Sequence, residues 1–489
     1  MDWTYNSVAP CLLREMGATG LKPCGTLHRT CMKKTKTKDS HLLEEWDKAH
    51  LWHPFTQMKD FQAEKPIIIE EAEGVILRDI YGSEYIDGVS SMWCNIHGHR
   101  NRHIDQAVKA QLDKVAHSTM LGLSNVPAIR LAKRLVEITP KGLNKVFYSD
   151  NGSTAVEVAL KMSFQYWLQM GLPEKQRFIA LEHGYHGDTL GAVGVGGIKS
   201  FHELHKPLLF NTALAPSPHC YRCPLHKDKE TCKLACLEKL EEILKKNCRE
   251  TAALIMEPLV QGAGGMIVHP PGFLKGVREL CSKYDVLLIA DEVMTGFGRT
   301  GRMFACEHED VVPDIMCLSK GINGGYMPLA ATLTTDKIYS AFLGDRGKTF
   351  YHGHTYTGHP LGCAAALASL DLFENEGVLE KLQPKIRLFN ESLNRFHELK
   401  HVGDIRHIGL IAGIELVRDK KAKEEFHPGN RVGQEVVLEA RSRGVFLRPL
   451  GDVIVIMPPL SITADELTRL LEIIYESIRG LESAREQYF

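Results

Sequence analysis

Five short apolar segments, each followed at once by polar residues or glycine, constrain the fold more than any other feature of the sequence. Each is about as long as a buried strand and lacks alternation, which favours a parallel sheet covered on both faces. Helical patterns lie between several of them, as expected for an α/β domain. The segments, each quoted together with the polar residues and glycines that follow it, are KVFYSDNGS (145–153), RFIALEHGYHGDT (177–189), TAALIMEPLVQGAGG (251–265), DVLLIADEVMTGFGRTG (285–301) and DIMCLSKGINGG (314–325).

The polar residues after these segments are candidates for one site, because ligands of such sheets bind beyond the carboxyl ends of the strands. Lys320 and Asp291 follow two of the segments. Gly152 and Ser153 open a helix after a third, where backbone N–H groups and the helix dipole favour a phosphate. Each has an ordinary alternative: a surface lysine, a carboxylate paired with Arg299, and an N-cap formed by Ser153 or Thr154.

Together these residues match the needs of one cofactor, pyridoxal phosphate (PLP). It requires a lysine for its aldehyde, an acid opposite its ring nitrogen and a cradle for its phosphate. Lys320, Asp291 and the turn at Gly152 and Ser153 supply all three. The acid keeps the ring nitrogen protonated, so that the ring can accept electrons, and the neutral amine of Lys320 can move a proton once an amino substrate displaces it.

The stretches LLIADEVMTGFGRTG and PDIMCLSKGINGG resemble the signature of class III PLP-dependent aminotransferases, and the resemblance covers residues 45–485. It implies the type I fold of PLP enzymes: an α/β large domain with a mainly parallel sheet, plus a smaller α+β domain built from both chain ends. The implied division is a basic, disordered extension (1–40), the N-terminal part of the small domain (41–93), the large PLP-binding domain (94–372) and the C-terminal small domain (373–489). Thr463 and Glu466 predict a capping box for a helix in the last part.

The resemblance also assigns roles by position. It implies that Lys320 binds the cofactor covalently, that Asp291 faces the ring nitrogen and that Tyr185, in GYHGD, stacks on the ring as part of the catalytic group. Glu257 and Gln261 are expected near the ring oxygen. In YHGHTYTGHP, Thr355 and His354 are implied to bind cofactor, Thr355 from the neighbouring subunit. A homodimer with shared active sites follows from that resemblance.

Within the family, LWHPFTQM (51–58), DGVSSMWCNIHGH (87–99) and LRPLGDVIVIMPPL (447–460) resemble the branch that aminates 8-amino-7-oxononanoate in biotin biosynthesis. Arg448 is implied to bind the carboxylate of this substrate, since a guanidinium can grip a carboxylate with two parallel hydrogen bonds. The other implied substrate-binding residues are Phe55, Met92, Trp93 and Gly353.

The amino donor stays open between S-adenosylmethionine and L-lysine, because many relatives have tryptophan at the position of Met92 and tyrosine at that of Phe55. Three other functions also stay open. They are another class III amine or diamine transaminase, an aminomutase, and a metal-stabilised binding or redox protein on a spent cofactor fold.

A group of four cysteines lies in HCYRCPLHKDKETCKLAC (219–236), away from these motifs. The spacing, Cys220-x2-Cys223-x8-Cys232-x3-Cys236, is compatible with zinc or an iron–sulfur cluster, with a disulfide or redox pair, or with unligated thiols. No metal is expected among the catalytic residues.

Charge and composition exclude several classes of partner. The 59 basic and 60 acidic residues are balanced, which argues against a binder of nucleic acid or acidic membranes. No apolar run is long enough to span a bilayer. With 13 cysteines and no secretory signal, the expected location is the cytoplasm. The first 38 residues hold seven Lys and Arg against two acids, which suggests an organelle presequence or a true start at Met32.

Overall fold

The computed structural model describes the backbone of residues 28–485 and the side chains of residues 39–481. The chain divides into a smaller unit, Met1–Glu70 with Asp79–Gly82, and a larger unit, Glu71–Arg78 with Ser83–Phe489. The smaller unit contains helices α1 (His28–His50) and α2 (Met58–Ala63). Residues 28–40 are therefore helical, unlike the disorder expected for 1–40, and the stretch from His28 to His50 contains neither proline nor glycine. Residues 1–27 of the expected extension lie outside the described residues.

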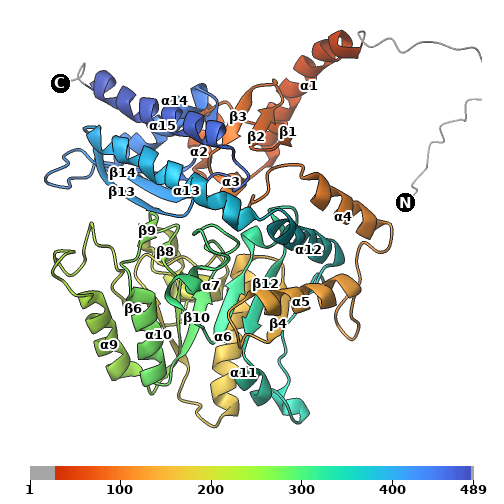
Figure 1. Ribbon diagram of the computed structural model, residues 1–489, viewed down its shortest axis with the longest axis vertical. Coiled ribbons are helices and arrows are strands. Elements are labelled where there is room, and N and C mark those ends of the chain that lie inside the picture. Colours follow the sequence, from red (N-terminus) through yellow and green to blue (C-terminus); the bar gives the residue numbers. More distant parts are fainter. Residues whose placement is uncertain (1–27, 486–489) are drawn as a thin grey trace, which may run out of the picture. The chain divides into compact units, whose positions relative to one another are not determined.

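The larger unit is built around a seven-stranded sheet with the order β4-β12-β11-β10-β7-β5-β6 (Figure 1). Strand β12 is antiparallel to both of its neighbours, and the other adjacent pairs are parallel. Six strands consequently run in one direction, and their carboxyl ends meet at one edge. The strands are β4 (Lys145–Ser149), β5 (Arg177–Leu181), β6 (Thr212–Ala215), β7 (Thr251–Met256), β10 (Leu287–Asp291), β11 (Ile315–Leu318) and β12 (Ala330–Thr334).

Both faces of this sheet are buried, as the apolar segments predict. In β10, Leu287 and Ile289 belong to the hydrophobic cluster formed with helix α6 (Gly152–Gln169). Leu288 and Ala290 belong to a second cluster on the other face, formed with helix α10 (Phe273–Lys283). Successive side chains of a strand point to opposite faces, so a strand covered on both sides has to be apolar throughout. The expected α/β class is confirmed.

Other helices complete the covering layers (Figure 1). Helix α12 (Pro360–Asn375) packs against α4 (Arg102–Leu112), α5 (Val126–Ile138) and the 3₁₀ turn η3 (Lys320–Asn323). The remaining helices of this region are α7 (Leu190–Gly194), α8 (Lys199–His202), α9 (Ala235–Asn247) and α11 (Asp336–Ala341), with 3₁₀ turns η1 (Glu203–Leu208), η2 (Ala305–Glu309) and η4 (Arg346–Lys348). A short hairpin joins β8 (Val260–Gln261) to β9 (Ile267–Val268).

Two smaller sheets bring segments from both ends of the chain into the structure. Strand β15 (Val445–Phe446) pairs in parallel with β3 (Glu84–Asp87), in a sheet of order β1-β2-β3-β15 that also contains β1 (Ile69–Glu73) and β2 (Ile76–Asp79). The second has the order β13-β14-β17-β16 and is antiparallel. Its strands are β13 (Val402–Ile408), β14 (Ile411–Leu416), β16 (Pro449–Leu450) and β17 (Val453–Ile456). Strand pairing thus joins residues near both ends of the chain, and the proposed division into domains stays a prediction.

The C-terminal helices are α13 (Val378–Asn394), α14 (Val432–Ser442) and α15 (Ala464–Arg485), with short helix α3 (Ser90–Trp93) and 3₁₀ turns η5 (Arg395–Glu398) and η6 (Pro428–Asn430). The capping box expected for α15 is confirmed. The N–H of Thr463 donates to Oε2 of Glu466 at 2.8 Å, and the N–H of Glu466 donates to the Thr463 hydroxyl at 3.2 Å. Such a box satisfies two backbone donors at the helix start.

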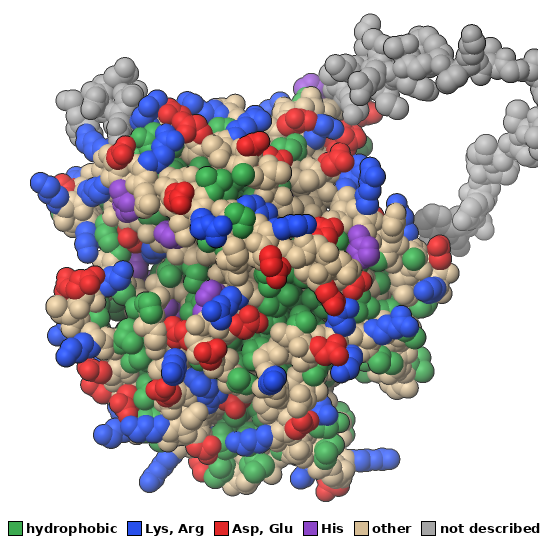
Figure 2. Space-filling model, viewed as in Figure 1, with side chains coloured by type: hydrophobic (Ala, Val, Ile, Leu, Met, Phe, Trp, Pro, Cys, Tyr) green, Lys and Arg blue, Asp and Glu red, His purple; other side chains and the backbone are tan. Residues whose placement is uncertain are grey.

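Among the described residues, no helix combines the length and apolar character needed to cross a bilayer. On the face of the molecule shown in Figure 2, Lys and Arg side chains are interspersed with Asp and Glu.

Candidate active site

Lys320 and Asp291 lie at the same edge of the central sheet. Asp291 is the last residue of β10, and Lys320 follows the neighbouring parallel strand β11, in which Cys317 pairs with Asp291. Lys320 has a φ of 42°, in the left-handed region that non-glycine residues rarely adopt. Such strained positions concentrate at functional sites. The backbone therefore departs from regular geometry at the lysine that the sequence singles out.

The environment of Lys320 favours a neutral amine. Burial lowers the pKa of Lys320, and the carboxylates of Asp291 and Glu257 oppose this shift. Its Nζ lies 5.1 Å from the centroid of the Trp93 ring. Desolvation disfavours the ammonium form, and the neutral amine is the nucleophilic form of lysine. The ordinary alternative, a solvated surface lysine, does not describe this residue.

Asp291 is paired with a histidine, not with Arg299. Nδ1 of His186 lies 2.7 Å from Oδ2 of Asp291, and both side chains are buried. Oδ1 of Asp291 accepts a hydrogen bond from the N–H of Val293 at 3.1 Å. The Arg299 guanidinium instead donates to the carbonyls of Asn95 and Pro458. The pairing with Arg299 considered from the sequence is therefore replaced by a buried His–Asp pair.

Glu257 holds the turn that carries Tyr185. Its Oε1 accepts from the N–H of Tyr185 at 3.0 Å, and its Oε2 accepts from the N–H of Gly262 at 2.8 Å. Burial raises the pKa of Glu257 to about 7, with a further upward contribution from Asp291. Gln261 joins the same turn, since its Nε2 donates to the carbonyl of Glu182 at 2.8 Å. Both residues thus position the backbone around Tyr185.

Tyr185 and the start of helix α6 are joined through Asp188. The Tyr185 hydroxyl donates to Oδ2 of Asp188 at 2.6 Å, and the N–H of Asp188 donates to Oγ of Ser153 at 3.2 Å. Burial, followed by the hydrogen bond with Asp188, raises the pKa of Tyr185. Asp188 therefore links Tyr185 to Ser153, whose predicted roles stay predictions.

The N-cap of α6 is Asn151, not Ser153 or Thr154. The Asn151 side chain accepts from the N–H of Thr154 at 3.1 Å, and the Thr154 hydroxyl completes the capping box. The cap uses neither the hydroxyl of Ser153 nor the N–H groups of Gly152 and Ser153. A helix start with N–H groups outside its cap suits an anion such as phosphate.

Gly152 is required by close packing. A Cβ at this position would lie 2.6 Å from Cγ1 of Val293, much closer than van der Waals contact. Val293 follows Asp291 by two residues, so this contact brings the start of α6 against the end of β10. The start of α6 and the end of β10 are therefore neighbours in the fold.

Trp93 and Met92 lie in a strained segment. Ser90, Ser91, Met92 and Trp93 all have positive φ values, from 46° to 72°. Asp87 anchors the segment, because its carboxylate accepts from both the N–H and the hydroxyl of Ser91 at 2.8 Å. Trp93 is buried beside Lys320, whereas Met92 is exposed. Phe55 belongs to the smaller unit, where its side chain is exposed, and its role stays a prediction.

Arg448 is half-buried directly before β16. Burial lowers its pKa, and Tyr185 opposes this shift, which places the two side chains within electrostatic reach. The loop at Gly353, His354 and Thr355 reaches the start of α6: Nε2 of His354 lies 3.8 Å from Oδ1 of Asp150. Thr355 itself is exposed.

Two residues of this site were not identified as site residues from the sequence. His186 and Asp188 lie in the quoted motif GYHGD beside Tyr185, but only the fold shows that His186 meets Asp291 from another strand end. The motif itself was the signal that could have identified them.

This site and fold define a family. The sequence model of "Aminotransferase class-III" matches residues 58–478, and the chain belongs to that family. It is an aminotransferase, as the resemblance implies.

The chain is also similar to individual aminotransferases. The chain is 59% identical over 443 residues to the adenosylmethionine-8-amino-7-oxononanoate aminotransferase of Geobacter sulfurreducens, covering 90% of this chain and 98% of that protein. The crystal structure of the enzyme of that name from Methanocaldococcus jannaschii has a TM-score of 0.87 at 49% identity, covering 90% of this chain and 99% of the other. A PLP-bound amine transaminase from an uncultivated Pseudomonas species has a TM-score of 0.84 at 37% identity, covering 88% and 98%.

Proposed function

We propose that this aminotransferase uses PLP to convert 8-amino-7-oxononanoate to 7,8-diaminononanoate in biotin biosynthesis. The observation that carries the proposal is the placement of Lys320 and Asp291 at the ends of two adjacent parallel strands, beside the start of α6. The names of relatives at 50–59% identity support the choice of substrate.

The residues present fit PLP. Lys320 would bind the aldehyde, Asp291 the ring nitrogen, and the first turn of α6 the phosphate. When bound, the cofactor supplies an electron sink for negative charge at a substrate carbon. The buried His186 fixes the orientation of the Asp291 carboxylate through a hydrogen bond to Oδ2. Burial keeps the Lys320 amine available to take and return a proton.

Arg448 is proposed to bind the acceptor carboxylate. Its guanidinium is half-buried. The side chain of Tyr185, on which the cofactor ring is proposed to stack, is near enough to affect the pKa of Arg448. A partly desolvated arginine holds a carboxylate more strongly than an exposed one. The strained segment at Met92 and Trp93 would form the opposite wall of the substrate pocket.

The protein is proposed to act as a homodimer in the cytoplasm. Several large apolar side chains are exposed near the loop that carries Thr355, which suits a subunit interface. They are Leu121, Leu123, Val126, Ile129, Tyr351 and Tyr356. The ring of Tyr356 lies 5.1 Å from that of His117, so the loop is adjacent to the segment before α5. The ten described cysteines are free thiols, which suits a reducing compartment.

S-adenosylmethionine is the proposed donor, because the relatives' names include it. L-lysine is the second candidate, since exposed Met92 offers no aromatic face for stacking where many relatives have tryptophan.

The test is a donor panel. Protein loaded with PLP is incubated with 8-amino-7-oxononanoate and S-adenosylmethionine, L-lysine or L-alanine in turn, and 7,8-diaminononanoate is measured by mass spectrometry. Product is expected with S-adenosylmethionine and is absent in Lys320→Ala. Faster turnover of simple amines with other oxo-acids would favour an amine transaminase, and isomerisation of a substrate without any donor would favour an aminomutase.

A further inference from the structure

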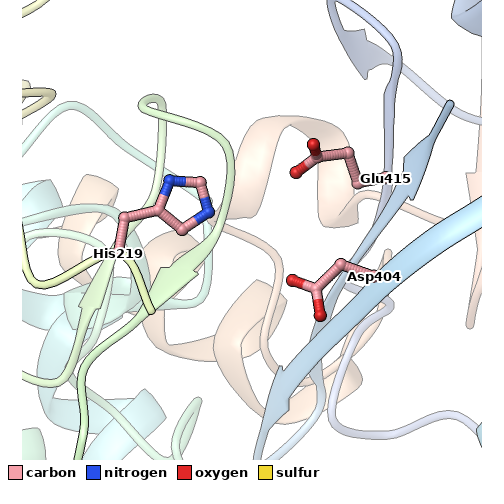
Figure 3. A group of neighbouring side chains, drawn as sticks. All are labelled: His219, Asp404 and Glu415. Carbon is pink, nitrogen blue, oxygen red and sulfur yellow. The ribbon is translucent and has the colours of Figure 1, made fainter. Parts of the chain in front are cut away.

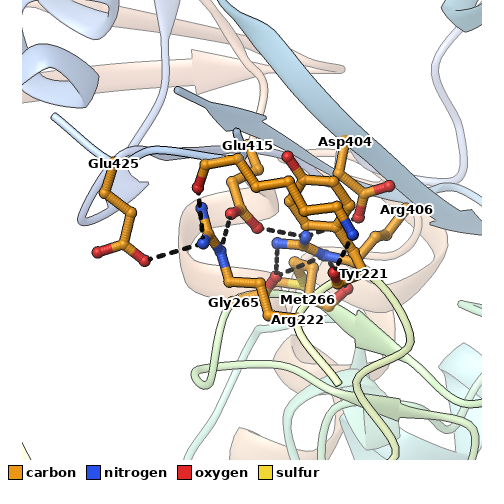
Figure 4. Close-up of polar contacts among 9 residues, drawn as sticks. Tyr221, Arg222, Gly265, Met266, Asp404, Arg406, Glu415 and Glu425 are labelled. Carbon is orange, nitrogen blue, oxygen red and sulfur yellow. Dashed lines mark hydrogen bonds and ion pairs between the residues drawn. The ribbon is translucent and has the colours of Figure 1, made fainter. Parts of the chain in front are cut away.

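Two groups of potential metal ligands lie outside the active site, and the first is already neutralised. His219, Asp404 and Glu415 have ligand atoms within 4.8 Å of one another (Figure 3). However, Oε1 of Glu415 accepts from Nε of Arg222, and Oε2 accepts from Nη1 of Arg406, each at 2.5 Å. Nη1 of Arg406 also lies 2.8 Å from Asp404 (Figure 4). Two guanidinium groups balance the two carboxylates, so this group is an ion-pair network and not a cation site.

The second group is in a long irregular segment. Strand β6 ends at Ala215 and helix α9 begins at Ala235, and the residues between contain neither helix nor strand. We call residues 216–236, which include the first two residues of α9, the cysteine loop. Irregular loops of this length are uncommon within compact domains unless a function or an additional constraint maintains them. The described contacts of the loop with the rest of the fold concentrate at its first half, around Tyr221 and Arg222.

All four cysteines of the loop line one small pocket. Cys220, Cys223, Cys232 and Cys236 share it with Ser217, His219, Lys227 and Lys229. Each thiol is half-buried and free. A local turn follows the second and the third cysteine, because the N–H of His226 donates to the carbonyl of Cys223 and the N–H of Ala235 to that of Cys232, both at 3.0 Å.

We propose that these four cysteines together bind one structural Zn²⁺ ion. The pairs are separated by two and three residues, the spacing at which structural zinc sites place ligands around a tetrahedron. Four thiolates close the coordination sphere and leave no position for a substrate. Each thiol would release its proton to solvent as its sulfur bonds the ion. The sulfurs would move inward from the pocket wall to about 2.3 Å from the metal.

The charges around the pocket match such a centre. A zinc ion with four thiolates carries a net double negative charge, and Lys227 and Lys229 line the same pocket. Cys236 lies in the first turn of α9, where the helix dipole favours negative charge. The N-cap of this helix, Leu234, provides no side-chain hydrogen bond, so the first-turn N–H groups have no side-chain cap there.

The ion would stabilise the contacts between the cysteine loop and the region of the sheet β13-β14-β17-β16. Nη1 of Arg222 donates to the carbonyl of Lys423 at 3.0 Å, and Nζ of Lys423 donates to the carbonyl of Tyr221 at 2.8 Å. Tyr221 and Arg222 are the two residues between the first pair of cysteines. A metal that holds this pair would also hold the Arg222–Glu415 ion pair in place.

The test uses the full chain, expressed without added zinc and purified without a chelator. Elemental analysis should find about one zinc per chain, as a single site of four thiolates requires. A mercurial reagent should release that zinc in proportion to four thiols modified. The double variant Cys220→Ser/Cys232→Ser should lose the metal and melt at a lower temperature. Cys248→Ser, at a half-buried free thiol at the C-terminal end of α9, is the matched control and should keep it.

Several results would overturn the proposal. They are zinc retained in the double variant, iron in place of zinc, and a metal-free native chain whose four thiols either react freely or are locked in disulfides. The mercurial titration is made on unmodified protein, so it decides the question even if the double variant does not fold.

Discussion

His186 and Asp291 form a buried pair in which Nδ1 of the imidazole lies 2.7 Å from Oδ2 of the carboxylate. They come from different strand ends, β5 and β10, so the fold itself brings them together. A second partner of Asp291, the N–H of Val293, fixes the other carboxylate oxygen. The carboxylate is therefore oriented from both sides.

Replacing His186 should weaken catalysis through Asp291. We expect His186→Ala to lower kcat by about 10- to 100-fold, as removal of a hydrogen-bonding partner around a reactive centre commonly does. Asp291→Asn should cost about 10³-fold or more, because a preorganised charge is lost. The double variant should be no slower than Asp291→Asn alone.

Steady-state kinetics and the pH profile of kcat measure these effects. The control is His269→Gln, which replaces a buried histidine outside the site. Additive losses would show that His186 does not act through Asp291.

Arg448→Ala should weaken binding of the acceptor without disturbing the cofactor. Loss of a bidentate partner for a partly desolvated carboxylate is worth about 2–4 kcal/mol, which corresponds to a rise in KM of about 30-fold or more. Arg443→Ala removes an exposed arginine that pairs only with Glu439 among the contacts described, and should leave KM unchanged. An unaltered KM in Arg448→Ala, with a normal cofactor spectrum, would reject this assignment.

Mixing subunits tests whether Thr355 serves the neighbouring active site. Lys320→Ala and Thr355→Ala proteins are unfolded and refolded together at equal amounts. If Thr355 acts across the interface, each hybrid dimer has one intact site, and random mixing should give about one quarter of the wild-type activity. If Thr355 serves its own chain, no intact site forms, and the activity equals the mean of the two parents. Refolded wild-type protein provides the reference.

Glu257 should make the cofactor-free protein less stable as the pH rises. Its pKa is raised from 4.5 to about 7 by burial, so the folded chain binds a proton that the unfolded chain has already released. Its stabilising contribution is full below pH 4.5 and is lost as the pH rises through 7, by about 3 kcal/mol at most. Glu257→Gln should flatten the fall in unfolding free energy over this range. Urea unfolding at a series of pH values measures it, and equal slopes in both proteins would contradict the pKa shift.

The sheet and its functional edge were predictable from local sequence. Apolar segments such as the one ending at Asp291 show burial on both faces, and a shared strand direction places Asp291 and Lys320 at one edge. Both inferences need only the periodicity of side chains and the rule for ligands of parallel sheets.

Contacts between distant segments were not predictable in this way. Arg299 follows Asp291 closely in the sequence, but it is drawn to the carbonyls of Asn95 and Pro458, and His186 takes its place. Asn151 forms the N-cap in place of Ser153 or Thr154, because the helix begins at Gly152, before both hydroxyl residues. Helix termini and long-range pairs depend on tertiary packing, which local propensity does not encode.

The parallel pairing of β3 with β15 has a consequence for synthesis on the ribosome. Ile86 meets Val445, so one partner is translated early and the other almost last. During that interval one edge of β3 has no native partner, and an unpaired edge is a template for pairing with other nascent chains. A message truncated before the codon for Val445 would yield a chain with this edge permanently open. Such a product should be a substrate for chaperones and proteases even though its seven-stranded sheet is complete.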